Sequence, residues 1–175
     1  MLSARRLLKL GVSGATLTTA ILLAKPSHAQ EGWLVDGEFG IAEGLEGGTP
    51  EGGSLGWRRA RLRLVAGADL RTDESESEGY GLRAFVELEG RGTLGAEARY
   101  LRWATRSVGA YAGITGTIVP ETLFGGTAGA RFIIPMGRAG LFLEPSLSVL
   151  PLGSDLPQNG PLIWALFSIG LRLGL

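Results

Sequence analysis

The residues that could do chemistry are few, and their spacing allows two readings. Ser146 and Ser148 stand two apart beside Glu144, a spacing that could supply a nucleophile pair with a base. Glu87 and Glu89 share one strand parity and could form a glycosidase-like carboxylate pair. Each has a simpler interpretation, in which the serines fill a polar strand face and the glutamates pair with nearby arginines.

Histidine and cysteine limit this chemistry further. The only histidine is His28, which lies at a signal cleavage site, and the chain has no cysteine. A mature chain without either residue cannot build a Ser-His-Asp triad, a cysteine nucleophile or an ordinary zinc site. We therefore predict that the protein is not an enzyme and has no cofactor and no metal.

Residues 1–29 have the organisation of a secretory signal peptide. A charged region with Arg5, Arg6 and Lys9 precedes a weakly apolar stretch, and Ser27-His28-Ala29 has the small-x-small pattern of a cleavage site. We expect residues 30–175 to form one exported domain. An uncleaved anchor is the alternative, but the apolar stretch is short and contains Gly, Ser and Thr. The formal net charge of zero argues against nucleic acid as a partner.

The last stretch of the chain shows the element type most clearly. From Ile163 to Leu175 every second residue is apolar, which is the period of a two-faced strand. Thirteen residues span about 43 Å, enough to cross a bilayer at a tilt. Seven further segments alternate in the same way, and no segment has a helical period. The strands are predicted at 32–42, 54–71, 79–90, 93–104, 107–119, 122–134, 139–150 and 162–175.

Across the middle of each of these segments the charged residues keep to one parity, and the other parity is apolar and free of charge there. Acids and arginines on the charged parity nearly balance, as expected if they pair inside a closed lumen. Large charged residues beside many glycines fit a narrow interior. The predicted lumen ion-pair network consists of Asp36, Glu38, Arg59, Arg61, Arg63, Asp69, Arg83, Glu87, Glu89, Glu97, Arg99, Arg131, Glu144 and Arg172.

Where the charged face points decides between two kinds of barrel. Lipid excludes charge from the outer face, because Arg or Lys at mid-membrane costs about 2 to 4 kcal/mol. A soluble lipocalin-like barrel would have the reverse arrangement, with polar residues outside and apolar residues inside. We predict an all-β fold, an eight-stranded antiparallel up-and-down transmembrane β-barrel. The alternation fails at 101–103, which predicts a bulge or the membrane edge there.

The signal peptide, the two-faced strands and the terminal segment 167–175 together resemble the small eight-stranded outer-membrane barrels of the OmpA and OmpX type. The resemblance is one of architecture. It implies location in the outer membrane of a Gram-negative cell envelope, contact with outer-membrane lipid, and recognition of the last strand by the barrel-insertion machinery. In that family the last strand usually ends in an aromatic residue, whereas this chain ends in Leu175.

The sequence leaves the role of the barrel open. The first hypothesis is a structural or surface-interacting protein whose loops 43–53 and 151–161 contact a partner. The second is a barrel that binds a small hydrophobic molecule, either in the membrane or as a soluble periplasmic protein. The third is a narrow, porin-like pore gated by the row of arginines, although a barrel of this size is just wide enough for side chains to fill.

Overall fold

A computed structural model describes residues 33–48, 56–72, 77–89, 92–154, 156 and 160–174; the side chains of 33, 58, 59 and 72 are excluded. Residues 1–29, predicted to be a signal peptide, lie outside this range. Within it no helix is long and apolar enough to cross a membrane. The described elements are β1 (Trp33–Gly48), β2 (Gly56–Thr72), β3 (Glu78–Glu87), β4 (Leu94–Trp103), β5 (Val108–Val119), β6 (Leu123–Met136), β7 (Ala139–Gly153) and β8 (Leu162–Gly174).

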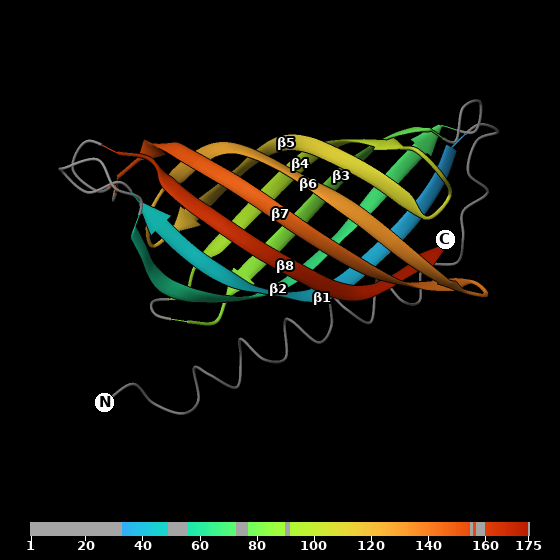
Figure 1. Ribbon diagram of the computed structural model, residues 1–175, viewed down its shortest axis with the longest axis horizontal. Helices are drawn as coiled ribbons and strands as arrows, with labels where there is room; N and C mark the ends of the chain where they lie inside the picture. Colours follow the sequence, from blue (N-terminus) through green and yellow to red (C-terminus); the bar gives the residue numbers. More distant parts are fainter. Residues whose placement is uncertain are drawn as a thin grey trace. The chain divides into compact units, whose positions relative to one another are not determined.

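The strands of the described part form a closed antiparallel barrel in chain order, with β8 paired to β1 (Figure 1). The predicted fold class is therefore confirmed. Paired residues followed once around the barrel from Gly44 lead back to Leu34, ten residues earlier on β1. For eight strands this stagger corresponds to a tilt of about 40°, which is in the usual range for barrels.

The two ends of the barrel differ in what they carry, and we name them accordingly. The terminal end is where β1 begins and β8 ends, and it also carries the connections after β2, β4 and β6. The loop end carries the connections after β1, β3, β5 and β7. The tightest connection joins β6 to β7 through Gly137 and Arg138, where Gly137 has a φ of 69°. A residue with positive φ is what two-residue hairpin turns require, and glycine adopts it without strain.

Several strand boundaries differ from those predicted. β1 runs on to Gly48 and β7 to Gly153, so both predicted contact loops, 43–53 and 151–161, begin inside strands. The predicted first strand ended at residue 42, directly before Glu43, which puts a charge on the apolar parity. Pairing with β2 carries the strand past it, up to Gly48 opposite Gly56.

The bulge that was one of the two predicted explanations for the pattern at 101–103 is absent. β4 pairs with β5 without interruption there, and its register shift lies at Leu94/Gly95 instead. Leu101 and Trp103 are buried and Arg102 is exposed, so the alternation simply continues. It looked broken because large apolar residues stand on the inward parity at this end of the barrel.

Candidate functional site: the ion-paired lumen

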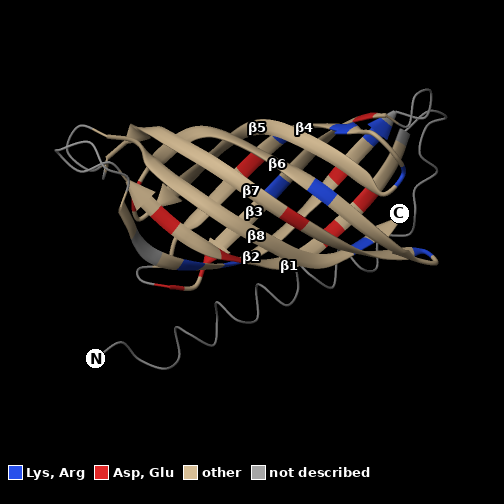
Figure 2. Cartoon of the chain, viewed as in Figure 1, with Lys and Arg blue, Asp and Glu red and all other residues tan. Residues whose placement is uncertain are grey.

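Alternation along the strands sends one set of side chains into the lumen and the other set outward. In β3 and β4 every second residue is buried, and the buried set includes Arg83, Glu87, Glu97 and Arg99. The exposed set in the same strands is almost wholly apolar. Figure 2 shows most of the charged positions along the strands of the barrel wall. A pleated strand has only these two sides, so each strand separates polar from apolar residues by itself.

The central cluster, defined here as Glu38, Asp69, Arg83, Arg99, Arg131 and Glu144, crosses the lumen. Arg83 Nη1 donates to Glu144 Oε1 at 2.7 Å and its Nε donates to Glu38 Oε1 at 2.7 Å. Arg131 Nη2 donates to Glu38 Oε2 at 2.6 Å, and Arg131 also pairs with Asp69. These bonds join β3 to β7 and β1 to β6, strands that are not neighbours in the sheet. Their side chains therefore occupy the bore.

The acids and bases of the central cluster are matched in number and deeply buried. Glu144 accepts hydrogen bonds from Arg83, Arg99 and Arg131. Glu144 and Arg131 each have 0% of their surface exposed. A buried charge is tolerated only when it is paired and hydrogen-bonded, and removing one partner of a buried pair typically costs about 3 to 5 kcal/mol.

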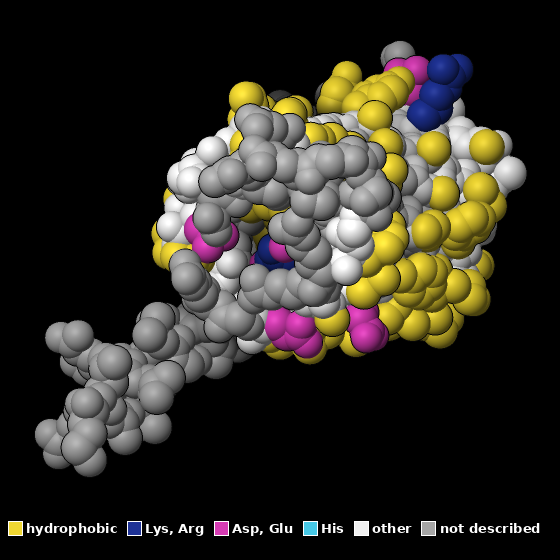
Figure 3. Space-filling model, turned by 60° about the vertical axis from the view of Figure 1, so that its left-hand side comes forward, with side chains coloured by type: hydrophobic (Ala, Val, Ile, Leu, Met, Phe, Trp, Pro, Cys, Tyr) yellow, Lys and Arg dark blue, Asp and Glu magenta, His cyan; other side chains and the backbone are white. Residues whose placement is uncertain are grey.

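A second group, the loop-end cluster, consists of Glu46, Arg61, Arg63 and Glu87. Arg61 pairs with both Glu46 and Glu87, and Arg63 Nε donates to Glu87 Oε1 at 2.7 Å. Trp164 joins it from β8, because its Nε1 donates to Glu46 Oε2 at 2.9 Å. In the space-filling view the loop end is hollowed, and acidic and basic side chains are visible inside the hollow (Figure 3).

The third group, the terminal-end cluster, is smaller and less enclosed. Asp36 accepts from Arg71 Nη2 at 3.1 Å and also pairs with Arg172. The side chains of Asp36 and Arg71 are 12% and 13% exposed. Two arginines thus share one carboxylate near the end of the lumen, where water is closer.

Aromatic rings fill the space that the ion pairs leave. The Arg63 guanidinium lies 4.1 Å from the ring centre of Trp164 and 4.4 Å from that of Phe85. Arg83 and Arg131 lie over Phe142, and Arg71 and Arg172 lie over Trp103. A guanidinium can stack on a ring face while its N–H groups donate at the edge, so each arginine uses both surfaces.

Small residues make room for these rings. Gly40 of β1 faces Gly170 of β8, and Phe142 lies against both. A Cβ built on Gly40 would lie 2.9 Å from Phe142 Cζ. The sequence pattern associated glycines with a narrow interior. Some of these glycines therefore lie where an aromatic ring occupies the space that their own side chain would need.

Most of the predicted network residues lie inside the barrel. Buried there are Asp36, Glu38, Arg61, Arg63, Asp69, Arg83, Glu87, Glu97, Arg99, Arg131, Glu144 and Arg172. Glu97 has no hydrogen-bond partner at Oε1 among the described residues, and the ion pairs around it join other groups. Glu89 is exposed in the turn after β3, because the strand ends at Glu87, so its predicted place in the lumen is wrong. The side chain of Arg59 lies outside the described part.

The serines and glutamates considered as a nucleophile pair with a base, or as a carboxylate pair, are bonded to other groups in the structure. Ser148 donates to Thr127 at 2.9 Å, and Ser146 donates towards the backbone oxygen of Leu166. Glu144 is occupied by arginines, and Glu87 is bound by Arg61 and Arg63. These contacts match the simpler interpretation, in which the serines fill a polar face and the glutamate pairs.

Sequence reasoning missed Glu46, Trp103 and Phe142 as lumen residues. Glu46 fell in a predicted loop, yet it has the same parity as Asp36 and Glu38, which was the signal that could have found it. Trp103 and Phe142 are apolar residues on the inward parity, and alternation of polarity cannot reveal them.

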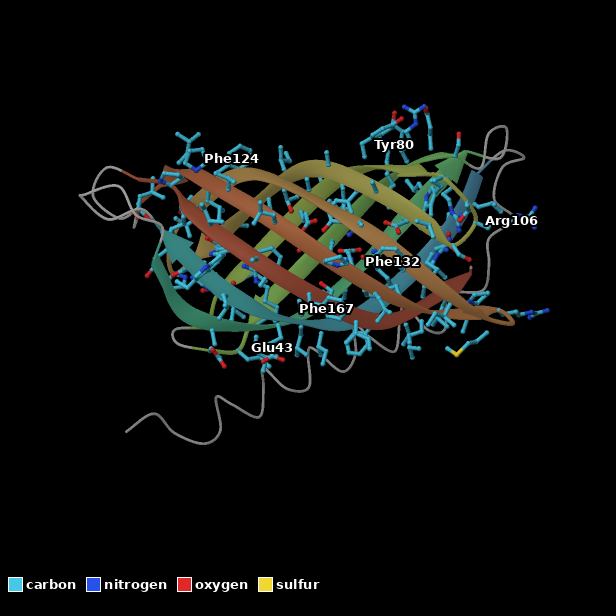
Figure 4. All side chains as sticks on the ribbon, viewed as in Figure 1. Glu43, Tyr80, Arg106, Phe124, Phe132 and Phe167 are labelled. Carbon is cyan, nitrogen blue, oxygen red and sulfur yellow. The ribbon has the colours of Figure 1, made fainter. Side chains whose placement is uncertain are left out.

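The exterior of the barrel is apolar. Outward residues such as Leu82, Ile114 and Phe124 are exposed at 66%, 52% and 46%. Tyr80 and Tyr100 stack at 5.6 Å between ring centres. Figure 4 places Tyr80 and Phe132 towards one end of the barrel and Phe124 towards the other. A soluble protein does not expose a continuous surface of this kind, whereas lipid requires one. With the charges inside, the fold and the lumen define a small membrane β-barrel.

Comparisons with known proteins found distant structural similarity only. No protein-family model matches the chain, and no curated protein matches it. A structure from a study titled "De novo design of transmembrane beta-barrels" is similar, with a TM-score of 0.42, 11% identity, and 78% of this chain and 95% of that chain covered. Ail, the attachment invasion locus protein of Yersinia pestis, is also similar, with a TM-score of 0.36, 13% identity, and 82% and 100% covered. No functional inference rests on likeness this distant.

Proposed function

We propose that this protein is an outer-membrane barrel with a sealed lumen, which acts as a structural or surface-contact element and not as a pore or an enzyme. The terminal end would face the periplasm, because both ends of the barrel chain lie there and exported barrels are threaded from that side. In this proposal β8 serves as the signal for the insertion machinery, and outer-membrane lipid covers the apolar exterior.

The observation that carries the sealed lumen is the central cluster. Arg83 and Arg99 reach Glu144 across the lumen, and Arg131 reaches Glu38. An ion that passes through would have to break several charge-assisted hydrogen bonds in a dehydrated space. The aromatic rings of Phe142 and Tyr111 pack beside this cluster, against Arg131 and Arg99. The same filling also disfavours a hydrophobic ligand inside the lumen.

Two of the connections at the loop end are short, which limits the surface that a partner could contact there. The connection after β5 spans 120–122 and the one after β3 spans 88–93. A partner at the loop end would therefore contact a narrow rim, chiefly the strand ends and the connections after β1 and β7.

Planar-bilayer recording tests the sealed lumen. We expect the folded protein to insert without stepwise currents, and we expect a Glu38→Ala/Glu144→Ala double variant to conduct, with selectivity for anions because arginines then predominate. Heat-modifiable gel mobility would show that both proteins are folded. Stepwise currents from the unaltered protein that change with Arg61→Ala would contradict the proposal and favour a narrow pore.

A further inference from the structure

The terminal-end cluster has more positive than negative charge. Arg71 and Arg172 share the single carboxylate of Asp36. In the central cluster three arginines meet three acids, and in the loop-end cluster two arginines meet two acids. Glu97, the remaining buried acid, lies nearer the loop end than Trp103 does on the same strand. Among the described residues, the terminal-end cluster is therefore the group inside the barrel in which arginines outnumber acids.

Two buried hydrogen-bond donors of this cluster have no acceptor. The ring centre of Trp103 lies 5.0 Å from Cζ of Arg71 and 5.6 Å from Cζ of Arg172. Trp103 is 5% exposed and Arg172 is 7% exposed. The Nε1 of Trp103 and the Nε of Arg172 have no hydrogen-bond partner among the described residues. Because buried polar groups are nearly always paired in native proteins, these two donors need an acceptor that the described side chains do not supply.

Asp36 adds an acceptor to the same place. The hydrogen bonds that it accepts from Arg71 and Arg172 all reach Oδ2, so Oδ1 can accept a further one. A ligand that satisfies the cluster must therefore accept hydrogen bonds from the donors and also donate one to Oδ1. Inorganic phosphate does both at neutral pH, because each of its forms keeps a proton beside its charged oxygens. Sulfate and the phosphodiesters of lipid head groups have no such proton.

We propose that the terminal-end cluster binds one inorganic phosphate ion. The guanidinium groups of Arg71 and Arg172 and the Nε1–H of Trp103 donate to its oxygens, and Asp36 Oδ1 accepts its proton. The planar fork of N–H groups on arginine suits phosphate oxygens, and charge-assisted hydrogen bonds of this kind are among the strong ones. The site depends on the barrel fold and is independent of whether the lumen conducts and of which way the barrel faces.

An ion can reach this cluster from the terminal end of the barrel. The side chains of Asp36 and Arg71 are 12% and 13% exposed, so the cluster is partly open to solvent. Figure 4 shows Arg106 at this end. The exposed charged residues described there are one acid and three bases, Glu78, Arg102, Arg106 and Arg138. A surface with this balance of charge raises the local concentration of anions.

Calorimetric titration of the folded protein in a maltoside detergent, which contains no phosphate, tests the site. We expect sodium phosphate at neutral pH to bind saturably at one site, with a dissociation constant of about 1 mM or lower. Sodium sulfate and dimethyl phosphate, which represents a lipid head group, should bind about tenfold more weakly at the same ionic strength, because neither donates to Asp36. Asp36→Asn should remove the preference for phosphate over sulfate, because an amide can donate to sulfate.

Two tryptophan variants locate the binding site within the barrel. Trp103→Phe keeps a ring for the arginines and removes the N–H donor, so phosphate affinity should fall about tenfold. Trp164→Phe is the matched control, because Trp164 is also buried and stacked on Arg63, but its Nε1 already donates to Glu46. This control should leave phosphate affinity unchanged. Heat-modifiable gel mobility checks that each variant is folded.

Three results would overturn the proposal: no saturable binding of phosphate, sulfate that binds as tightly as phosphate, or equal losses with Trp103→Phe and Trp164→Phe. A fourth concerns segment 73–76, which follows β2 and contains Asp73, Glu74 and Glu76. Phosphate binding that appears only after these three acids are replaced by Asn and Gln would show that a carboxylate of the chain itself occupies the cluster.

Discussion

The inner and outer faces of the same strands carry opposite kinds of side chain, polar and charged inside and apolar outside. On β7, Glu144 is fully buried and bound by arginines, while its neighbour Leu147 is half exposed to the surroundings. On β5, Thr115 is buried in the lumen and Ile114 beside it is exposed. A soluble barrel buries apolar side chains inside, whereas this barrel buries paired charges inside and has apolar side chains outside. Removing one partner of a buried pair leaves an uncompensated charge, so each face can be disturbed separately.

The largest effect is expected from the centre of the inner face. Glu144→Gln removes the charge that Arg83, Arg99 and Arg131 share, and leaves buried guanidinium groups under-compensated. We expect a loss of about 3 to 5 kcal/mol in the free energy of unfolding, measured by urea titration in lipid vesicles. Ser146→Ala on the same strand is the control. A loss within about 1 kcal/mol of that control would contradict the assigned role of the cluster.

The outer face should respond to charge in proportion to depth. Ile114→Arg places a guanidinium in mid-membrane, and we expect it to cost about 2 to 4 kcal/mol in the same titration. Val119→Arg at the loop-end limit of β5 should cost about 0 to 1 kcal/mol, because a charge near the interface reaches water. Equal costs at the two positions would mean that the exterior does not face hydrocarbon.

The closeness of packing inside the lumen can be tested with a methyl group. A Cβ on Gly170 would lie 2.6 Å from Phe142 Cε1 and 2.6 Å from Gly40 Cα. We expect Gly170→Ala to cost about 1 to 3 kcal/mol of unfolding free energy. Gly56→Ala is the control, since nothing lies within 4 Å of the added atom there. Identical stability of both variants would contradict close packing of the β1 backbone and the Phe142 ring against Gly170.

The smallest effect is expected at the end of the inner face. Asp36→Asn removes the acid that Arg71 and Arg172 share, but water can reach this cluster and replace part of the interaction. We expect a loss of about 1 to 2 kcal/mol. Added salt should shrink this loss and leave the effect of Glu144→Gln nearly unchanged, because screening acts on exposed charges. A salt response of equal size in both variants would remove the distinction between the clusters.

The sequence allowed the fold and most members of the lumen network to be predicted, because the parity of a residue in a pleated strand decides whether it points inward or outward. Arg83 and Arg99 could be assigned to the interior in this way. Which acid each arginine binds could not be predicted, since those contacts depend on the stagger of the barrel and cross between distant strands. The contact between Arg131 and Glu38 spans 93 residues.

Two groups of residues could not be placed correctly from the sequence, for physical reasons. Glu43 interrupts the apolar parity, so the first strand seemed to end there, although backbone pairing continues. Trp103, Phe142 and Trp164 are apolar residues on the inward parity, and a polarity pattern cannot identify them as partners for arginine. Their position follows from geometry, because a guanidinium needs both acceptors at its edge and a surface for its face.

The link between Arg172 and Asp36 has a kinetic consequence. These residues are 136 positions apart and belong to the last and first strands. This bond cannot form until the first and last strands are both in place, and the contact of Arg131 with Glu38 likewise needs β1 and β6 together. Before the barrel closes, the sheet therefore contains arginines that are not yet neutralised, and these must be kept away from hydrocarbon until the final strand is in place. The interior should become ordered at the same time as the slow, long-range step of assembly.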